Sequence, residues 1–277
     1  AIFPQWLFQG KEELGIISIC RVLFQAISVP LFFVFIENAN DAWKAAAIYS
    51  LPHLAIGIFS IYIIINKKWV KFTTITIDDV KDEVFRSIPL FISSAAVSIY
   101  TTTITVVLGF ISSPTNVGLY AAASKIIQAF QGIYQPIAMA YYPRISKFVT
   151  ESRVRAINEI IKLRNIQIVL NASISIFLYF YAELLIMLLF GSEYLEAVIV
   201  LKILSPIPFV VGLSNIYGIQ TLLTFGFKKV FSRILILSAM ANLLMIYPLC
   251  YAYYEIGAAI SVLATELLVT VLMVFSV

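Results

Sequence analysis

The sequence predicts an all-α polytopic membrane protein, a bundle of about eight transmembrane helices. Hydrophobic residues fill 61% of its 277 positions and charged residues only 12%, whereas an average globular protein carries roughly 25% charge. The apolar residues gather in runs of the roughly 20 residues that a helix needs to cross a bilayer. Within these runs, for example from Ile16 to Ile36, hydrophobicity does not alternate from residue to residue, which argues against the strands of a membrane barrel.

Eight apolar runs, separated by short polar segments, are the candidate transmembrane helices. They cover residues 14–36, 43–66, 87–111, 118–140, 166–190, 197–224, 231–254 and 256–277. Because these spans use almost all of the apolar residues, little is left for an independent water-soluble core. We therefore expect no enzyme, no large catalytic domain and no nucleic acid as a partner.

Basic residues concentrate in every second loop, and this asymmetry predicts the orientation of the helices. The loops on the basic side contain Lys11, Lys67, Lys68, Lys71, Lys81, Arg86, Arg144, Lys147, Arg153, Arg155, Lys162, Arg164, Lys228, Lys229 and Arg233, whereas the intervening loops contain Lys44 alone. The positive-inside rule places the N-terminal segment and the loops at 67–86, 141–165 and 225–233 in the cytoplasm. With eight spans, we expect the C-terminal end of the chain to be cytoplasmic as well.

Two of these loops are long enough to form amphipathic helices on the membrane surface. Residues 77–86 place Ile77, Val80 and Val84 on one face and charged side chains on the other, and residues 154–164 show a similar pattern. We expect both segments to connect transmembrane helices while lying on the membrane.

A weak internal similarity relates residues 5–12 to residues 220–228. Both segments precede a predicted span, and six helices separate them, which is the spacing of a parallel repeat in a two-lobed transporter. On this interpretation residues 1–66 are the last two helices of one lobe, residues 67–86 are a cytoplasmic linker, and residues 87–277 are a complete six-helix lobe.

Five charged residues fall inside the predicted spans: Arg21, Lys125, Lys202, Glu183 and Glu266. Each costs roughly 2.5 to 3.5 kcal/mol in lipid unless it faces protein or water. Arg21 is placed to bind phosphate bidentately or to pair with a carboxylate. Lys202 and Glu183 lie near the outer ends of their spans, where an interfacial position explains them equally well. Glu266 lies near the middle of the last span, where it either titrates or pairs with a lysine.

The fourth span carries a polar stripe. At 100° per residue, Ser124, Lys125, Gln128, Gln131 and Gln135 fall within one arc of the helix, opposite an apolar face. Such a stripe in the middle of a membrane lines a water-filled cavity or forms interhelical hydrogen bonds.

The sixth span contains Ser205-Pro-Ile-Pro208, followed by Gly212 and Gly218. Proline frees backbone carbonyls and permits bending of a membrane helix, so this span is expected to be broken or mobile, either as a hinge or as a static kink. No phosphate-binding loop or metal-ligand cluster is present in the sequence, and Cys20 and Cys250 lie far apart in apolar segments. We expect no cofactor, no metal and no catalytic residue.

A set of motifs, taken in order, resembles the Wzx family of O-antigen flippases, in the polysaccharide-transporter branch of the superfamily that also contains MATE exporters. The motifs are Phe3-Pro-Gln-Trp-Leu-Phe-Gln-Gly-Lys-Glu12 before the span with Arg21, Val117-Gly-Leu-Tyr-Ala-Ala-Ala-Ser-Lys125, Pro136 followed by Tyr142-Pro-Arg-Ile-Ser146, Leu189-Phe-Gly-Ser-Glu-Tyr194 and Ser214-Asn-Ile-Tyr-Gly-Ile-Gln220. The resemblance covers the whole chain.

The resemblance implies a twelve-helix, MATE-like transporter of two six-helix lobes, of which this chain would be a fragment, helices five to twelve, truncated at its N-terminus. Members of the family flip an undecaprenyl-pyrophosphate-linked O-antigen unit from the cytoplasmic to the periplasmic leaflet of the bacterial inner membrane, for lipopolysaccharide biosynthesis. The implied partners are this lipid-linked oligosaccharide, membrane lipids, O-antigen polymerase and the chain-length machinery.

The resemblance also implies a cationic central cavity and alternating access. On this chain the substrate-binding residues would be Arg21, Lys125, Gln128, Gln131, Gln135 and Lys202, and the ion-coupling residues would be Glu183 or Glu266. One alternative is a MATE-like ion-coupled exporter of organic cations and drugs, which favours carboxylates over bases in its cavity. Another is a membrane scaffold without transport, which predicts no exposed cavity around Gln128 and Gln131.

Overall fold

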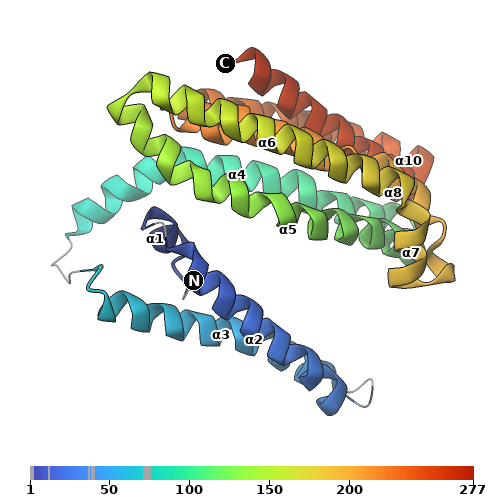
Figure 1. Ribbon diagram of the computed structural model, residues 1–277. Coiled ribbons are helices and arrows are strands. Elements are labelled where there is room, and N and C mark those ends of the chain that lie inside the picture. Colours follow the sequence, from blue (N-terminus) through green and yellow to red (C-terminus); the bar gives the residue numbers. More distant parts are fainter. Residues whose placement is uncertain (1–2, 12, 37, 39–40, 71–75) are drawn as a thin grey trace. The chain divides into compact units, whose positions relative to one another are not determined.

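The computed structural model describes residues 3–11, 13–36, 38, 41–70 and 76–277. Residues 1–2, 12, 37, 39–40 and 71–75 lie outside the described part, and with them Glu12 of the first motif and Lys71 of the predicted linker. The described residues form helices and no strand, which confirms the predicted all-α class (Figure 1). The chain divides into two compact units, Ala1–Ile77 and Asp78–Val277, and each is described by itself.

The first unit is a helical hairpin preceded by one short helix. It consists of α1 (Gln5–Gly10), α2 (Leu14–Phe35) and α3 (Ala42–Asn66). Its small core joins Phe8 to Ile56 and Ile63, and the ring of Phe8 meets that of Trp69 edge-on at 5.2 Å. Glu13 at the start of α2 forms an ion pair with Lys67 after the end of α3. These contacts hold the start of α2 against the end of α3.

The second unit is a bundle of long helices with one broken element. It comprises α4 (Ile77–Ile111), α5 (Pro114–Glu151), α6 (Arg153–Phe180), α7 (Ala182–Phe190), η2 (Ser192–Tyr194), α8 (Ala197–Leu204), α9 (Ile207–Ser214), η3 (Asn215–Leu223) and α10 (Lys228–Phe275). The Ser113 hydroxyl caps α5 by accepting from the Asn116 amide at 3.3 Å, and Pro114 takes the first turn, where its missing N–H costs nothing. Helix α5 packs against α6, α8 and α10, and it is the element on which the cavity described below is built.

The outer surface of these helices is apolar. Phe110 is 87% exposed, Phe33 is 83% exposed and Leu244 is 78% exposed. In water such surfaces drive aggregation, whereas a bilayer requires them. Six helices within the described residues are long and apolar enough to cross a membrane, so the prediction of a multi-pass membrane protein is confirmed.

The eight predicted spans are mostly helical, although several boundaries differ, and the fifth, 166–190, is divided at Tyr181 between α6 and α7. Helices α4 and α5 extend beyond the predicted spans 87–111 and 118–140. The last two predicted spans, 231–254 and 256–277, lie within α10, which turns back at Tyr254. Helix α5 is long enough to cross a membrane but is not one of the six most apolar helices, because the polar stripe lowers its mean hydropathy.

The expectation of separate surface helices at residues 77–86 and 154–164 is wrong. Residues 77–86 are the first turns of the 35-residue α4, and residues 154–164 begin the 28-residue α6. Neither segment contains a glycine, and although Pro89 removes one backbone donor after the first segment, the helix continues through it. The amphipathic segments are therefore continuous with the transmembrane helices.

The sixth predicted span is broken, as expected from its prolines. Helix α8 ends at Leu204, α9 begins after Pro206, and residues 215–223 form the π-helix η3. Near the break, the Phe209 amide donates a hydrogen bond to the Ser175 hydroxyl on α6, at 3.3 Å. π-helical segments are rare and concentrate at functional sites.

Helix α10 folds back on itself at Tyr254, whose φ of 47° and ψ of −122° interrupt the helix. The buried Asn242 side chain joins the two halves, because its Nδ2 donates to the Thr265 hydroxyl at 2.8 Å and to the Ser261 carbonyl at 3.3 Å. Close approach at the turn depends on Gly257, where a Cβ would lie 1.9 Å from the Leu249 carbonyl oxygen.

We predict that Gly257→Ala lowers the melting temperature of the purified protein by several degrees, because the new methyl group pushes the two halves of α10 apart. Gly132→Ala on α5 is the matched control, since nothing lies within 4 Å of the position that its methyl group would take and alanine favours helix by about 1 kcal/mol over glycine. Equal melting temperatures for the two variants in detergent would contradict the proposed close contact.

Candidate functional site

A cavity of about 390 Å³ lies in the second unit, lined by α4, α5, α10 and the broken α8–α9 segment. Its apolar lining consists of Ile104, Tyr120, Ala121, Ile127, Leu204, Ile207 and Val262. Its polar lining consists of Thr101, Thr105, Ser124, Lys125, Gln128, Gln131 and Glu266. Pockets of this size that combine apolar walls with a few convergent polar groups are typical binding sites.

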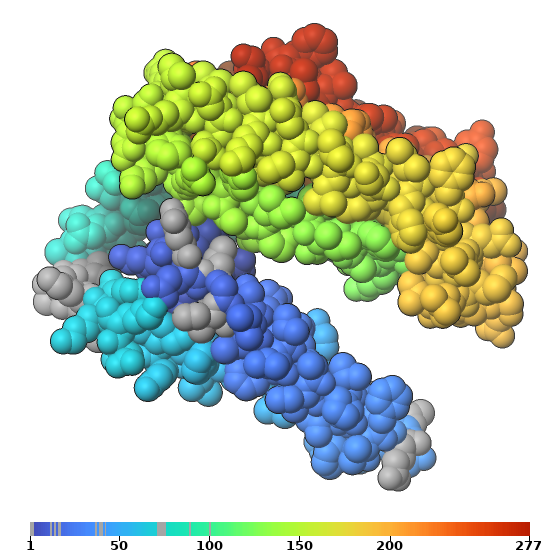
Figure 2. All heavy atoms as spheres, viewed as in Figure 1, coloured from blue at the N-terminus to red at the C-terminus, as the bar shows by residue number. Residues whose placement is uncertain are grey.

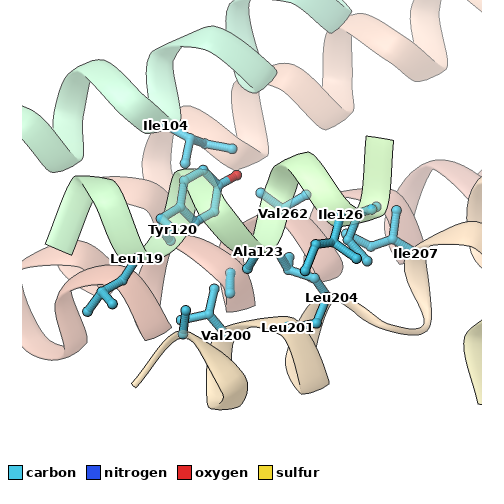
Figure 3. Close-up of a cluster of buried hydrophobic side chains, with 14 of the residues drawn as sticks. Ile104, Leu119, Tyr120, Ala123, Ile126, Val200, Leu201, Leu204, Ile207 and Val262 are labelled. Carbon is cyan, nitrogen blue, oxygen red and sulfur yellow. The ribbon is translucent and has the colours of Figure 1, made fainter. Parts of the chain in front are cut away.

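The apolar wall belongs to the main buried core of the unit. In Figure 3, Tyr120 on α5 reaches toward Ile104 on α4, and Leu204, Ile207 and Val262 lie on the neighbouring elements. Ile104 is fully buried and Leu204 is nearly so. Because this core is closely packed, it holds α5 at a fixed rotation, and the polar stripe of α5 keeps a fixed direction.

The polar side of the cavity comes mainly from α5. Ser124, Lys125, Gln128 and Gln131 recur every three to four residues, so they share one face of the helix. Lys125 and Gln128 are exposed, Gln131 is half-buried, and the buried Ser124 hydroxyl has no hydrogen-bond partner among the described residues. Of the two explanations for the stripe, the structure favours a cavity over interhelical hydrogen bonds.

Glu266 supplies the acid of the cavity from the second half of α10. Its side chain is buried, with 9% of the residue exposed, and its backbone carbonyl accepts a hydrogen bond from the Thr270 hydroxyl at 2.8 Å. The cavity lining therefore contains one lysine and one glutamate. A carboxylate at this depth is costly unless it is paired, hydrated or protonated, which makes Glu266 the best candidate in this unit for a group that changes its protonation or ion binding.

The remaining predicted site residues lie elsewhere. Gln135 is exposed one turn beyond Gln131 and does not line the cavity, and Glu183 is exposed in the first turn of α7. Lys202 is half-buried on α8 and holds its amine 5.8 Å from the centroid of the Tyr179 ring. Arg21 is exposed on α2, in the first unit. The structure therefore brings together Lys125, Gln128, Gln131 and Glu266.

Sequence reasoning missed the contribution of α4. Thr101 and Thr105 lie one turn apart and line the cavity opposite the stripe of α5. Their signal was present in the run Tyr100-Thr-Thr-Thr-Ile-Thr105, where hydroxyls four residues apart mark one face of an apolar helix. A threonine hydroxyl can form a hydrogen bond within its own helix, as Thr101 does by donating to the Val97 carbonyl at 2.9 Å. Because threonine in lipid therefore costs little free energy, its presence in a span does not by itself indicate a cavity.

A second polar set, also missed, lies inside the bundle. Gln167 and Asn171 are each 1% exposed and lie one turn apart on α6, and their amide groups have no hydrogen-bond partner among the described residues. Asn171 packs directly on Gly212 of α9. Gln220 of η3 donates to the Ala138 carbonyl of α5 at 2.9 Å. These amides lie beside the broken α8–α9–η3 segment and do not line the cavity.

Metal chemistry has no evident site in the described part of the chain. Among those residues, no group of three or more His, Cys, Asp or Glu side chains could hold a metal ion.

The chain is similar to proteins described as polysaccharide biosynthesis proteins or O-antigen transporters. A family model described as polysaccharide biosynthesis protein matches residues 1–149. An Escherichia coli K12 protein named as an O-antigen transporter is 41% identical over all of this chain and 66% of its own length. A Shigella dysenteriae protein with the same name is 30% identical over all of this chain and 69% of its own.

A third relative, the capsular polysaccharide biosynthesis protein CapF of Staphylococcus aureus, is 24% identical over 95% of this chain and 67% of its own. The chain thus spans about two thirds of the length of these curated relatives. No solved structure matches the chain.

We predict that the cavity is open to water. In a variant lacking Cys20 and Cys250, a cysteine placed at Gln128 should react with a membrane-impermeant thiol reagent. A cysteine at Ile126, which is 2% exposed on the buried face of the same helix, should react at least about tenfold more slowly, because a buried thiol meets reagent only when the packing opens. Equal protection of both cysteines would contradict a water-filled cavity and would favour the alternative of a membrane scaffold without transport.

Proposed function

This chain belongs to the polysaccharide biosynthesis protein family, and from that premise we propose that it forms the larger part of an O-antigen flippase. The substrate is an undecaprenyl-pyrophosphate-linked repeat unit, moved from the cytoplasmic to the periplasmic leaflet of the inner membrane. The relatives named as O-antigen transporters support the resemblance to the Wzx family. The observation that carries the mechanism is the cavity that joins Lys125, Gln128, Gln131 and Glu266 at membrane depth.

The cavity lining suits a substrate with a charged head and a polar glycan. Lys125 provides the cation for the pyrophosphate, and the two glutamines provide donors and acceptors for sugar hydroxyls. Thr101 and Thr105 add hydroxyls on the opposite wall. In this proposal Gln135 continues the polar path beyond the cavity, and Lys202 stands at its outer end.

A single lysine does not make the cavity strongly cationic, because Glu266 lines it too. A pyrophosphate carries more than one negative charge, so it needs further bases. We assign one of them to Arg21, whose guanidinium can bind phosphate oxygens bidentately, in the complete two-lobed protein. Residues 1–66 then belong to the first lobe, residues 67–86 to the linker and residues 87–277 to the second lobe.

Ion coupling follows from the same charge balance. Protonation of Glu266, or binding of a cation to it, leaves Lys125 as the only charge of the cavity lining and favours the anionic substrate. Loss of that proton or cation weakens the attraction and promotes release. Glu183 is the second candidate, although it lies outside the cavity lining.

Alternating access requires an element with two arrangements, and the broken α8–α9–η3 segment supports that role. Its π-helix and prolines leave backbone groups that can change partners. Gly212 and Gly218 allow close contacts there, with Asn171 and with Met273 respectively. A change at this segment reaches the cavity through Leu204 and Ile207, which line it.

The proposed setting is the bacterial inner membrane, with both ends of this chain on the cytoplasmic side. The positive-inside distribution of lysine and arginine supports that orientation. The proposed protein partners are O-antigen polymerase and the chain-length machinery, which take up the flipped unit. A MATE-like exporter of organic cations is not favoured, because a lysine lies in the cavity and the named relatives are O-antigen transporters.

We predict that Lys125→Ala in the full-length protein lowers O-antigen display at least about tenfold in a strain lacking its flippase, because one charge-assisted contact to phosphate is lost. Lys147→Ala, on the same helix but outside the cavity lining and paired with Glu151 at 3.9 Å, should complement fully. Wild-type display by the Lys125 variant, at matched protein levels, would remove this residue from the binding site.

We predict that Glu266→Gln abolishes the dependence of transport on the ion gradient, because a glutamine mimics the neutral carboxyl and cannot change its charge. Flipping by proteoliposomes containing the full-length variant should then be equal with and without an imposed proton or sodium gradient. Glu183→Gln should retain the gradient dependence of the wild type. The opposite pattern would assign coupling to Glu183.

A further inference from the structure

A second pocket in the same unit, of about 410 Å³, lies among the first half of α6, η3 and the end of α10. Its lining is mostly aliphatic and aromatic: Ile157, Ile160, Ile161, Ile216, Tyr217, Leu222, Phe225, Phe227 and Val277. It shares no lining residue with the cavity around Lys125. The proposed transport mechanism therefore does not use it.

Arg164 is the only charged residue that lines this pocket, and it is half-buried. Its guanidinium reaches the Asn165 side-chain oxygen at 3.4 Å, which is long for a hydrogen bond. Among the described residues, no carboxylate lies within 4.0 Å of it, in contrast to Arg144, which pairs with Glu159 at 3.0 Å. A guanidinium in this position retains donors for an anion.

The predicted span boundaries place the pocket near the cytoplasmic edge of the membrane. Arg164 precedes the predicted span 166–190 by two residues, and Phe227 precedes the predicted span 231–254 by four. Two walls of the pocket thus come from the predicted starts of two spans. Its apolar wall faces acyl chains while Arg164 stands at the depth of phosphate groups.

The surroundings of the pocket are basic. Arg153, Arg155 and Lys162 lie on the same part of α6, and Lys228 and Lys229 follow Phe227 at the start of α10, all of them exposed. Each such charge near an anionic membrane surface contributes about 1 kcal/mol of attraction. The field at the mouth of the pocket therefore favours a negatively charged amphiphile over a zwitterionic one.

We propose that this pocket is a binding site for an anionic phospholipid of the surrounding membrane, such as phosphatidylglycerol. The Arg164 guanidinium binds the phosphodiester bidentately, and one acyl chain occupies the apolar pocket between α6, η3 and α10. One guanidinium matches the single charge of a phosphodiester, whereas a pyrophosphate requires more than one base. The bound lipid would brace the π-helix η3, whose residues Ile216, Tyr217, Thr221 and Leu222 form one wall.

The test is native mass spectrometry of the full-length protein in mixtures of phosphatidylglycerol and phosphatidylethanolamine with identical acyl chains. The wild type should retain phosphatidylglycerol preferentially, and Arg164→Gln should reduce that preference at least about tenfold, because it removes a direct charge-assisted contact to the phosphodiester. Arg155→Gln, which removes an exposed charge of the same helix that does not line the pocket, is the matched control and should reduce the preference clearly less, because it weakens only the surrounding field.

Ser276→Trp provides a second variant in case Arg164→Gln does not fold, because it fills the pocket from the exposed end of α10 without changing charge. It should also reduce retention of phosphatidylglycerol. Unchanged retention in both variants, or an equal loss in Arg155→Gln, would overturn the site. Displacement of phosphatidylglycerol by equimolar undecaprenyl phosphate would overturn the assignment to a membrane phospholipid. These readouts do not depend on flipping, so they stand apart from the proposed function.

Discussion

The hydrocarbon core of a bilayer offers no hydrogen-bond partner, so every polar group at that depth must find protein or enclosed water. This constraint organises the second unit. The stripe of α5 would be costly against lipid, and it lines a cavity together with Thr101, Thr105 and Glu266. Asn242 is fully buried, and its Nδ2 joins the two halves of α10 by donating to the Thr265 hydroxyl and the Ser261 carbonyl. The apolar core around Tyr120 and Ile104 forms the buried wall of the same cavity (Figure 3).

The same constraint explains where the bundle is irregular. Broken helix is tolerated at membrane depth only where protein or a cavity surrounds it, and α8, α9 and η3 pack between α6 and α10. Gly212 and Asn171 make the closest part of that packing, and Gln220 reaches across to α5. The space-filling view presents the face of the second unit that α5, α6 and α7 cover, with the second half of α10 behind it (Figure 2). Irregular backbone and buried amides thus occur together, and the same broken segment reaches the cavity through Leu204 and Ile207.

Much of the fold could be predicted from the sequence, because a bilayer makes hydropathy a direct signal of each helix. All eight apolar runs are mostly helical, and the break at Pro206 was expected from the prolines, whereas the break at Tyr181 was not. The stripe from Lys125 to Gln131 was recognisable because helical periodicity places it on one face. Residues 77–86 and 154–164 were misjudged, since an amphipathic pattern is the same in a surface helix and in the exposed extension of a span. Thr101 of α4 and Glu266 of α10 line the same cavity as the stripe of α5. The sequence could not predict this, because the periodicity of one helix does not reveal which helices face one another.

In the proposed mechanism, the cavity of the second unit receives the phosphate head of the lipid-linked glycan. The decisive experiment is a structure of the full-length protein with an undecaprenyl-pyrophosphate oligosaccharide bound. We expect the Lys125 amine about 2.7–2.9 Å from a pyrophosphate oxygen, the length of a charge-assisted hydrogen bond, with sugars beside Gln128 and Gln131. A pyrophosphate bound outside the cavity, with Lys125 contacting only water or protein, would contradict it.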